Sequence, residues 1–450
     1  MTHVLRIMKR LFIAITLLVL MLPSVAQKDV SLKLDPAKAQ WFREAKFGMF
    51  IHWGLYSIFA GSYNGHTLPD ATLPNGRSWY AEWAEKRLQI PDKVYRGKAR
   101  EFSTPRYNPD EWVRLAKEAG MRYLVITAKH HDGFALWDSK VSHFDVELTP
   151  GKKDLLAPLV KACRKYGLKY GFYYSHWEDW EHPGGAKPEW EKQPTDAEYQ
   201  KYWEEKSLPQ VKELLVNYDP DLLWFDTWGS ESTLLTPARR DELIRLVRTY
   251  SKKCLINGRI CYTNPGDDVD FLEMMDNEYP AALQDRPWQT PATMQQSWGY
   301  HARDYNWKPA RQMLTYLVSN VSKGGNYLLN IGPKADGTLP LPAVRRLREM
   351  GGWMAANGEA VYGTSPVHIE APADVFLSQK TENGKHWLYV FLTRPMSQLT
   401  LPVKAVGGCQ VLETGQPVDC TATSGGSVSL AIPDGVFRDG SIQVLKLEIE

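Results

Sequence analysis

The sequence predicts an α/β fold in which a (β/α)8-like TIM barrel over residues 27–362 precedes a C-terminal antiparallel β-sandwich over residues 363–450. Two observations lead to this prediction. Short apolar runs typical of buried parallel strands alternate with helical patterns about eight times over ~330 residues. From about residue 365, short β-rich runs alternate instead with Gly, Pro and Ser, which is typical of a small sandwich. A doubly wound open sheet is the alternative, but the Gly-rich phosphate turn expected of that fold is missing.

The barrel elements are expected in the repeating order strand, loop, helix. The expected strands cover 46–54, 123–127, 169–174, 222–225, 254–259, 271–275 and 327–331, with a weak unit near 295–301. The expected helices cover 108–119, 153–166, 196–217, 237–252, 309–322 and 342–356. Prolines at first helical positions and glycines just past helix ends fit the preferences of helix termini. In the C-terminal region, strands are expected at 387–393, 399–403, 427–432 and 441–447.

Composition argues against some classes of function and weakly favours another. With 54 basic and 52 acidic residues, the formal net charge is only +2, which argues against a nucleic-acid-binding surface or a polybasic membrane surface. The chain also has 17 Trp and 22 Tyr residues. Some of these belong to the core, but their flat faces also suit stacking against sugar rings. The aromatic composition therefore weakly favours a carbohydrate-binding site.

The N-terminal residues 1–26 resemble a secretory signal peptide. Three basic residues precede an apolar stretch at 11–22, and Ser24 and Ala26 place small residues at the positions that a signal peptidase reads. The apolar stretch is short for a transmembrane helix, and no later segment is long and apolar enough to span a membrane. We therefore expect cleavage after Ala26 and a secreted or periplasmic protein without a membrane span.

The five cysteines give no sign of a metal cage or a redox motif, because no two of them have CxxC spacing. Cys409 and Cys420 lie close in the predicted sandwich and could pair in an oxidising compartment. The sequence leaves open whether they do so.

A carboxylate directly follows one of the predicted buried strands. Residues 222–225 are apolar and Asp226 comes next. A carboxylate at such a place is costly unless it is paired or used, although it could also cap the following helix. In a barrel, the carboxyl ends of parallel strands meet at one mouth, where active sites lie. The residues expected at this mouth are His52, His130, His131, Tyr173, Tyr174, Asp226, Arg259 and Glu278.

Such a set of residues suits the hydrolysis of a glycosidic bond. One ionised carboxylate attacks the anomeric carbon, while a protonated second carboxyl group gives its proton to the leaving oxygen. His, Tyr and Arg side chains supply directional hydrogen bonds for sugar hydroxyls, and Trp faces cover the apolar side of the ring.

A metal site is the competing interpretation of the same residues. The ligand types present would suffice for zinc: His52, His130, His131, His176, Asp132 and Asp179. However, adjacent histidines on a strand point to opposite faces, so His130 and His131 are not expected to share one ion. The HExxH motif is also absent. We therefore predict no metal and no other cofactor.

Several motifs, in order along the chain, carry a resemblance to a known family. The motifs lie at Lys46–Gly54, Glu82–Trp83, Lys129–Phe134, Tyr173–Ser175, Trp224–Asp226 and Gly324–Pro333. Together they resemble the α-L-fucosidases of glycoside hydrolase family 29 over about residues 41–360. The resemblance implies a barrel followed by a β-sandwich, and hydrolysis of α-L-fucosides with retention of configuration. It also implies a fucosylated oligosaccharide or glycoconjugate as the substrate.

The resemblance further implies roles for individual residues. Asp226 matches the family's nucleophile. The positions that match its fucose-binding residues are His52, Glu82, Trp83, His130, His131, Tyr173, Trp224, Arg259 and Trp298. Tyr173 fits the pocket tyrosine better than its neighbour Tyr174, and Trp298 matches an aromatic wall near the fucose methyl group.

In the family, the acid/base residue varies in position along the sequence, and its surroundings align poorly. Glu278 is the first choice, because it lies where many members carry a Glu followed shortly by Pro. Glu273 is the second choice. Many members also have a Trp-Glu pair slightly later, but this chain has Gln289 there, which cannot donate a proton as an acid.

Two other functions remain open at this point. The protein could be a glycan-binding homologue without turnover, which would be favoured if no second carboxyl group lies within about 5–6 Å of Asp226. It could also act on a sugar related to fucose in stereochemistry, such as a galactoside, which would be favoured by loss of the apolar surface near Trp298.

Overall fold

The computed structural model describes residues 31–229, 233–423, 425–437 and 441–450. The predicted signal peptide at 1–26 lies outside these residues. Among the described residues, no helix has both the length and the apolar character that crossing a bilayer requires.

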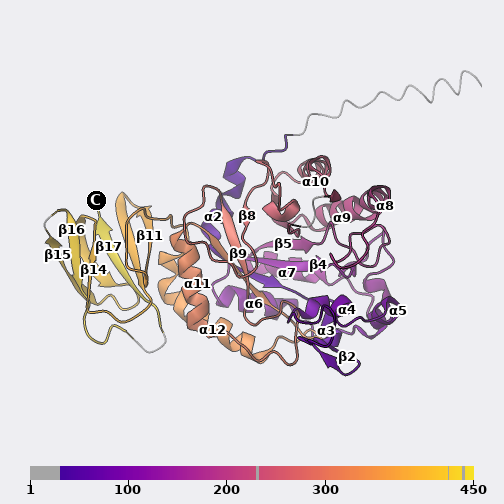
Figure 1. The fold of residues 1–450 in the computed structure, drawn as a ribbon. Coiled ribbons are helices and arrows are strands. Elements are labelled where there is room, and N and C mark those ends of the chain that lie inside the picture. The colour runs from indigo at the N-terminus through magenta and orange to yellow at the C-terminus, as the bar shows by residue number, and fades with distance from the viewer. Residues whose placement is uncertain (1–30, 230–232, 424, 438–440) are drawn as a thin grey trace, which may run out of the picture.

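Eight parallel strands form the first sheet, in the spatial order β7-β6-β5-β4-β1-β10-β9-β8 (Figure 1). The strands are β1 (Phe47–Ile51), β4 (Tyr123–Lys129), β5 (Lys169–Tyr174), β6 (Leu222–Phe225), β7 (Leu255–Ile256), β8 (Leu272–Glu273), β9 (Trp288–Thr293) and β10 (Asn326–Ile331). The two edge strands, β7 and β8, are joined by one further parallel bridge between Asn257 and Phe271. The sheet therefore curls round into the predicted barrel-like form.

Helices follow most of these strands. They are α6 (Pro109–Glu118), α7 (Leu156–Tyr166), α8 (Asp196–Tyr202), α9 (Leu208–Tyr218), α10 (Pro237–Tyr250), α11 (Ala310–Ser322) and α12 (Leu341–Asn357). The expected long helix at 196–217 is continuous, because the π-helical turn η5 (Trp203–Ser207) links α8 to α9. Side-chain caps define several starts; for example, Thr195 and Glu198 form a capping box at α8.

The strands β7 and β8 are shorter than expected, and no α-helix lies between them. After Ile256, the side-chain amide of Asn257, rather than the backbone, forms the hydrogen bonds to β6. Its Oδ1 accepts from Phe225 N at 2.8 Å, and its Nδ2 donates to Phe225 O at 2.9 Å. The chain then turns through η7 (Gly258–Ile260) instead of extending. This turn carries Arg259 to the mouth of the barrel.

The strand expected near 295–301 lies earlier in the chain, as β9, so that prediction was wrong. A proline within β9, Pro291, hides the strand signal. The carbonyl of the proline, and with it the missing N–H, faces the β8 side, where the carbonyl accepts from Asn277 N at 2.9 Å. The pairing of β8 with β9 ends at Glu273 and Gln289, before the proline, so no ladder bond is lost.

Aromatic side chains fill the barrel interior below the mouth. Phe50, Tyr123, Tyr173, Trp224 and others are buried together there. Glycine makes room for them: a Cβ on Gly48 would lie 2.4 Å from Tyr123 Cζ. The upper end of this aromatic core is the floor of the cavity described below.

The C-terminal region forms an antiparallel sandwich, as predicted. Its strands are β11 (Val375–Glu382), β12 (Lys385–Leu392), β13 (Gln398–Leu401), β14 (Ala405–Val411), β15 (Pro417–Thr423), β16 (Ser427–Ala431) and β17 (Gln443–Ile449). The sequence did not indicate β11, β14 and β15. The strand β14 contains the pair Gly407-Gly408, and most residues of β15 are exposed, so neither shows a clear apolar alternation.

Cys409 and Cys420 are free thiols in this structure. The pairing of β14 with β15 places Cys409 opposite Val418 rather than opposite Cys420.

The helices α11 and α12 lie between the barrel sheet and the sandwich (Figure 1). Trp353 of α12 donates from its indole nitrogen to Ile442 O at 2.7 Å, and Ser378 of β11 donates to Ala360 O at 2.8 Å. Phe391 and Val444 of the sandwich belong to the same buried apolar cluster as the barrel helices. The two regions therefore share a continuous core.

Candidate active site

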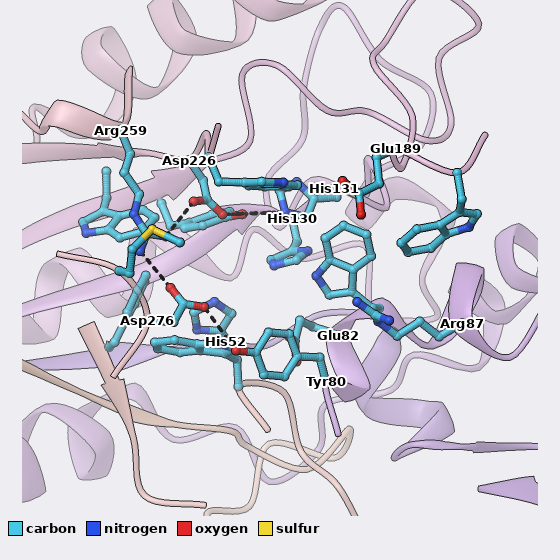
Figure 2. Close-up of a pocket in the computed structure, with 18 residues that line it drawn as sticks. His52, Tyr80, Glu82, Arg87, His130, His131, Glu189, Asp226, Arg259 and Asp276 are labelled. Atoms are coloured by element: carbon cyan, nitrogen blue, oxygen red, sulfur yellow. Dashed lines mark hydrogen bonds and ion pairs between the residues drawn. The ribbon is translucent and has the colours of Figure 1, made fainter. Parts of the chain in front are cut away.

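A cavity opens at the carboxyl ends of the barrel strands (Figure 2). Ten of the predicted site residues line it: His52, Glu82, Trp83, His130, His131, Tyr173, Trp224, Asp226, Arg259 and Trp298. Eight further residues line it that the sequence did not indicate: Phe50, Tyr80, Arg87, Glu189, Trp190, Trp228, Met275 and Asp276. Several lie directly after strands, as His52 follows β1 and His130 follows β4.

Asp226 lies directly after β6 at the base of the cavity and is 8% exposed. Its Oδ2 accepts from the Tyr173 hydroxyl at 2.8 Å, and its Oδ1 accepts from Arg259 Nη1 at 3.1 Å. Burial raises its pKa to about 6; Arg259 opposes this shift and the charge of Asp276 adds to it. Asp226 is therefore a fixed carboxylate that is ionised near neutral pH.

Arg259 joins Asp226 to a second carboxylate, Asp276. The Nη2 of Arg259 lies 2.8 Å from Asp276 Oδ1 and also donates to Met274 O at 2.8 Å. The Tyr80 hydroxyl lies 3.3 Å from Asp276 Oδ2. Although burial opposes it, the two aspartates hold the pKa of Arg259 above its usual value. Two carboxylates thus share one guanidinium at the same end of the cavity (Figure 2).

The two carboxyl groups predicted as acid/base candidates do not line the cavity. Glu278 is exposed, and its Oε2 accepts from Met275 N at 3.0 Å, which closes a turn. Glu273 is buried under the cavity in β8, where it accepts from Gln289 Nε2. Burial also raises the pKa of Glu273 well above its usual value. The structure brings Asp276, two residues before Glu278, to the cavity instead.

Three imidazoles line the cavity as neutral groups. Burial lowers the pKa of His52 to about 3 and lowers the pKa values of His130 and His131 well below their usual range. His52 is oriented by Asn330, whose Oδ1 lies 2.7 Å from its Nδ1. His130 stacks on Tyr173, with ring centroids 5.2 Å apart. A neutral imidazole can both donate and accept, which suits hydroxyl groups.

His130 and His131 line the same cavity, so the expectation that they point to opposite faces was wrong. The strand β4 ends at Lys129, and both histidines belong to the following turn, with ring centroids 4.3 Å apart. Within the described part of the chain, no group of three or more His, Cys, Asp or Glu side chains is arranged to hold a metal ion.

Glu82 presents a buried carboxyl group from the 3-10 turn η2 (Ala81–Trp83). Its Oε2 accepts from Gly299 N at 2.9 Å, whereas its Oε1 has no hydrogen-bond partner among the described residues. The same holds for His130 Nδ1. Burial raises the pKa of Glu82 to about 7. Buried polar atoms without partners are rare, so these two atoms are available to a ligand.

The cavity has one apolar corner and one charged rim. Phe50 lies between Trp224 and Trp298, at ring-centroid distances of 5.1 and 5.9 Å. At the end opposite Arg259, the guanidinium of Arg87 stacks on the rings of Trp83 and Trp190, and Glu189 lies nearby (Figure 2). Glu189 and Trp190 come from the long loop between β5 and α8, whose composition contained no motif, whereas Arg87 ends the short helix α4 (Ala84–Arg87).

Comparisons with known proteins agree with this geometry. A family profile described as alpha-L-fucosidase matches residues 24–359. The chain is 32% identical to an alpha-L-fucosidase of Dictyostelium discoideum over 368 residues, which cover 78% of this chain and 77% of the relative. It is 31% identical to the tissue alpha-L-fucosidase of Bos taurus, with 74% of this chain and 70% of the relative covered.

Solved structures give the same result. The structure of alpha-L-fucosidase isoenzyme 1 from Paenibacillus thiaminolyticus superposes with a TM-score of 0.77 at 30% identity, covering 92% of this chain and 99% of that one. An alpha-L-fucosidase of glycoside hydrolase family 29 from Bacteroides thetaiotaomicron superposes with a TM-score of 0.81 at 25% identity, covering 93% and 96%. This chain therefore belongs to the α-L-fucosidase family, family 29 of the glycoside hydrolases.

Proposed function

We propose that this protein is a retaining, exo-acting α-L-fucosidase that releases terminal α-L-fucose by double displacement. The observation that carries the proposal is the pair of carboxylates, Asp226 and Asp276, held by adjacent nitrogens of Arg259 at one end of a deep cavity. A retaining glycosidase needs two carboxyl groups about 5–5.5 Å apart, one as nucleophile and one as acid/base. Around the pair, the cavity is lined by the residues that match the family's fucose-binding positions.

In the first step, Asp226 attacks the anomeric carbon. A bond forms between its carboxylate oxygen and that carbon, and the bond from the carbon to the glycosidic oxygen breaks. Asp276 gives its proton to the departing oxygen. In the second step, Asp276 takes a proton from water, which attacks the same carbon and releases Asp226. Inversion at each step gives overall retention.

Asp276 is the acid/base that we propose, in place of Glu278. Asp276 is the second carboxyl group that Arg259 holds beside Asp226, and a retaining glycosidase needs a second carboxyl group next to its nucleophile. Glu278 would have to leave its turn contact with Met275 N to reach the cavity. Asp276 is preferred to Glu82 because Asp276, and not Glu82, shares Arg259 with Asp226.

The remaining residues suit the shape of fucose. The unpartnered Glu82 Oε1 and His130 Nδ1 would bind ring hydroxyls, with His52 beside them. The apolar corner of Phe50, Trp224 and Trp298 would receive the methyl group on carbon 5. A hydroxyl added to that methyl group would be buried there without a partner, which costs about 1–3 kcal/mol.

The proposed substrate is a fucosylated oligosaccharide or glycoconjugate. The proposed location is secreted or periplasmic, on the grounds of the signal-like residues 1–26.

Hydrolysis of an aryl α-L-fucoside, compared with the aryl α-L-galactoside that differs only by a hydroxyl on carbon 6, tests the proposal. We expect a preference for the fucoside of about 10- to 200-fold, and release of the α-anomer as the first product. Release of the β-anomer, or binding without turnover, would refute retaining hydrolysis.

A mechanism-based inactivator then identifies the nucleophile. A Bacteroides thetaiotaomicron relative was trapped as a covalent intermediate in complex with 2-fluoro-fucosyl fluoride, with the help of a Glu-to-Gln mutant of that protein. The same reagent should label the peptide that contains Asp226 of this chain. A label on another carboxylate would assign the nucleophile elsewhere.

A further inference from the structure

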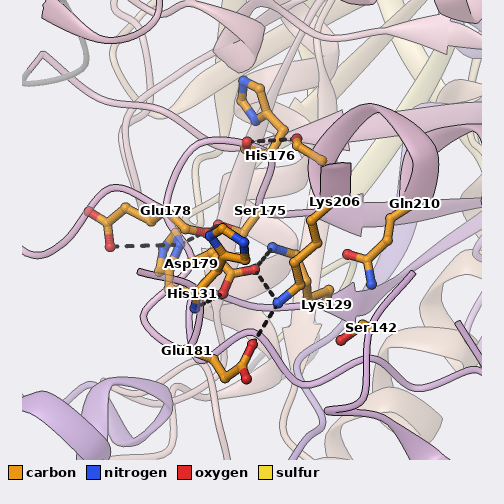
Figure 3. Close-up of polar contacts among 12 residues, drawn as sticks. Lys129, His131, Ser142, Ser175, His176, Glu178, Asp179, Glu181, Lys206 and Gln210 are labelled. Carbon is orange, nitrogen blue, oxygen red and sulfur yellow. Dashed lines mark hydrogen bonds and ion pairs between the residues drawn. The ribbon is translucent and has the colours of Figure 1, made fainter. Parts of the chain in front are cut away.

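His131 connects the cavity to a polar network behind it (Figure 3). On the cavity side, its Nε2 lies 3.6 Å from Asp226 Oδ2 and 3.4 Å from the Tyr173 hydroxyl. On the far side, its Nδ1 lies 2.7 Å from Ser175 Oγ. Ser175 directly follows β5 and is fully buried, and it is not among the residues that line the cavity. In a neutral ring only one of the two nitrogens carries a hydrogen, so a contact that keeps the hydrogen on Nδ1 leaves Nε2 able only to accept a hydrogen bond from a substrate.

The contacts of Ser175 determine where that hydrogen lies. Its Oγ is 2.6 Å from the backbone carbonyl oxygen of Glu178. A carbonyl oxygen can only accept, so at this distance the hydroxyl must donate to it. Because a serine has a single hydroxyl hydrogen, Ser175 can only accept from His131. The hydrogen in that contact therefore belongs to His131 Nδ1.

Neutral His131 has no second ring hydrogen. Burial lowers its pKa well below the usual range, and the charge of Lys129 acts in the same direction. The carboxyl group of Glu178 lies 4.0 Å from Nδ1, but burial raises its pKa to about 8, so it does not draw a second proton onto the ring near neutral pH. With Nδ1 protonated, the Nε2 of His131 is a bare acceptor.

We propose that Ser175 is a positioning residue that holds His131 in its Nδ1–H tautomer, so that Nε2 accepts a hydrogen bond from the sugar hydroxyl on carbon 2. This inference rests on the proposed function. Asp226 bonds to carbon 1, and the hydroxyl on the adjacent carbon 2 is the one nearest to the groups beside Asp226. Hydrogen bonds to this hydroxyl strengthen in the transition state of glycosidases.

The opposite tautomer would have two costs. Its Nε2–H would point toward Asp226 and Tyr173, where it would compete for the negative charge that attacks the sugar. Its bare Nδ1 would face the Ser175 oxygen, whose only hydrogen already goes to Glu178 O, so two lone pairs would meet at 2.7 Å. The serine therefore selects the tautomer without touching the substrate.

A pair of serine variants and a pair of substrates test the kinetic part. Ser175→Ala should lower kcat/KM on an aryl α-L-fucoside by about 10- to 100-fold, the usual cost of one misplaced hydrogen bond. On the aryl 2-deoxy-α-L-fucoside, which lacks the hydroxyl, the same variant should lose no more than about 3-fold relative to wild type. The matched control is Ser207→Ala. Ser207 is as buried as Ser175, and its hydroxyl donates at 2.9 Å to the backbone carbonyl of His176, the residue that follows Ser175. It makes no hydrogen bond to His131.

The outcomes separate the alternatives. A similar loss on both substrates, or an equal loss in Ser207→Ala, would show a general structural effect and overturn the proposal. If wild type itself does not hydrolyse the fucoside, the proposed function fails, and the tautomer is then decided by the next measurement.

The ring hydrogen can be located without any substrate. In protein labelled with ¹⁵N-histidine, the His131 signals are identified by their loss in His131→Gln. In wild type and in Ser207→Ala, we expect the ¹⁵N chemical shifts of a protonated Nδ1 and an unprotonated Nε2. In Ser175→Ala, we expect these chemical shifts to change toward those of the other tautomer. A protonated Nε2 in wild type would overturn the proposal.

Discussion

Two buried aspartates on either side of His131 have opposite electrostatic surroundings. Asp226, at the cavity, shares the single cation Arg259 with a second carboxylate. Asp179, behind the cavity, is bound by two cations, Lys129 at 2.7 Å and Lys206 at 2.9 Å (Figure 3). Burial raises the pKa of Asp226 to about 6. Burial acts on Asp179 in the same direction, but the two lysines outweigh it and hold its pKa below the usual range.

The difference separates a reactive carboxylate from a structural one. Where acids outnumber bases, a carboxylate remains basic and can exchange its charge for a bond to a sugar. Where two cations contact one carboxylate, as at Asp179, that carboxylate is held as an anion. Asp179 also accepts from His182 N at 2.9 Å, while its own N–H donates to Ala186 O, so it anchors the loop after β5. Burial alone therefore does not mark a catalytic residue; the balance of charge around it does.

The largest expected effect comes from Asp226→Asn. Loss of the proposed nucleophile should lower kcat on an aryl α-L-fucoside by about 10⁴-fold or more. Stability should not fall with it. Because the folded pKa of about 6 lies above the unfolded value, the group stabilises the fold only when protonated, and this contribution is lost as pH rises through about 6. Urea unfolding at pH 7 should therefore give a midpoint no lower than wild type; a large loss of stability would mean that Asp226 is structural.

The same substitution at the other site, Asp179→Asn, should do the reverse. It leaves Lys129 buried without an anion and leaves Lys206 with only Glu181, at 3.0 Å, which should lower the free energy of unfolding by about 3–5 kcal/mol. The control is Asp138→Asn, which breaks an exposed pair with Lys140 and should cost about 0–1 kcal/mol. Turnover per folded molecule should stay within about tenfold of wild type. Loss of activity in a fully stable Asp179→Asn protein would contradict the structural role of Asp179.

Substitution of Asp276 tests whether this carboxyl group, rather than Glu278, is the acid/base. Asp276→Ala should lower kcat/KM by about 10²- to 10⁴-fold on fucosides with a poor leaving group, because these need the proton. The loss should be much smaller on activated aryl fucosides, and added azide should restore turnover and yield fucosyl azide. Glu278→Ala is the control and should change kcat/KM by less than about 3-fold, since surface substitutions usually have small effects. The reverse result would restore Glu278 as the acid/base.

The smallest expected effect is a pH dependence. Asp226 must be ionised to attack, so kcat/KM should fall about tenfold per pH unit below an apparent pKa of about 6. The control Asp138→Asn should leave this acidic limb of the kcat/KM profile at the same pH. A limb near pH 4, about the usual value of an exposed aspartate, would show that burial does not raise the pKa of the nucleophile.

The sequence predicted those parts of the fold that rest on local patterns. The strand β5 has the expected bounds, because its apolar run is long and both ends carry clear signals. The positions of β7 and β9 were less accurate, because an asparagine side chain ends one strand and a proline sits inside the other. Neither effect follows from periodicity, since each depends on a neighbour far along the chain.

The same distinction holds for the site. Asp226 and His52 were expected at the mouth because each directly follows a predicted strand. Asp276 was missed in favour of Glu278, because a turn through Asn277, with φ at +57°, separates their side chains. Sequence spacing does not show which of two acids in one turn faces a cavity. Arg87 ends the short helix α4 (Ala84–Arg87), and Glu189 and Trp190 lie on the long loop between β5 and α8, so only the folded chain reveals their common rim.

The junction between β7 and β8 has a consequence for how this active site varies. The barrel closes there through short strands and the single bridge from Asn257 to Phe271. Between β7 and β9 the chain contains no α-helix that would have to keep its packing if residues were inserted or deleted. Arg259 and Asp276 both lie on this seam. Its length can therefore change, and shift the proposed proton donor along the sequence, while Asp226, directly after β6, stays in register with the rest of the barrel.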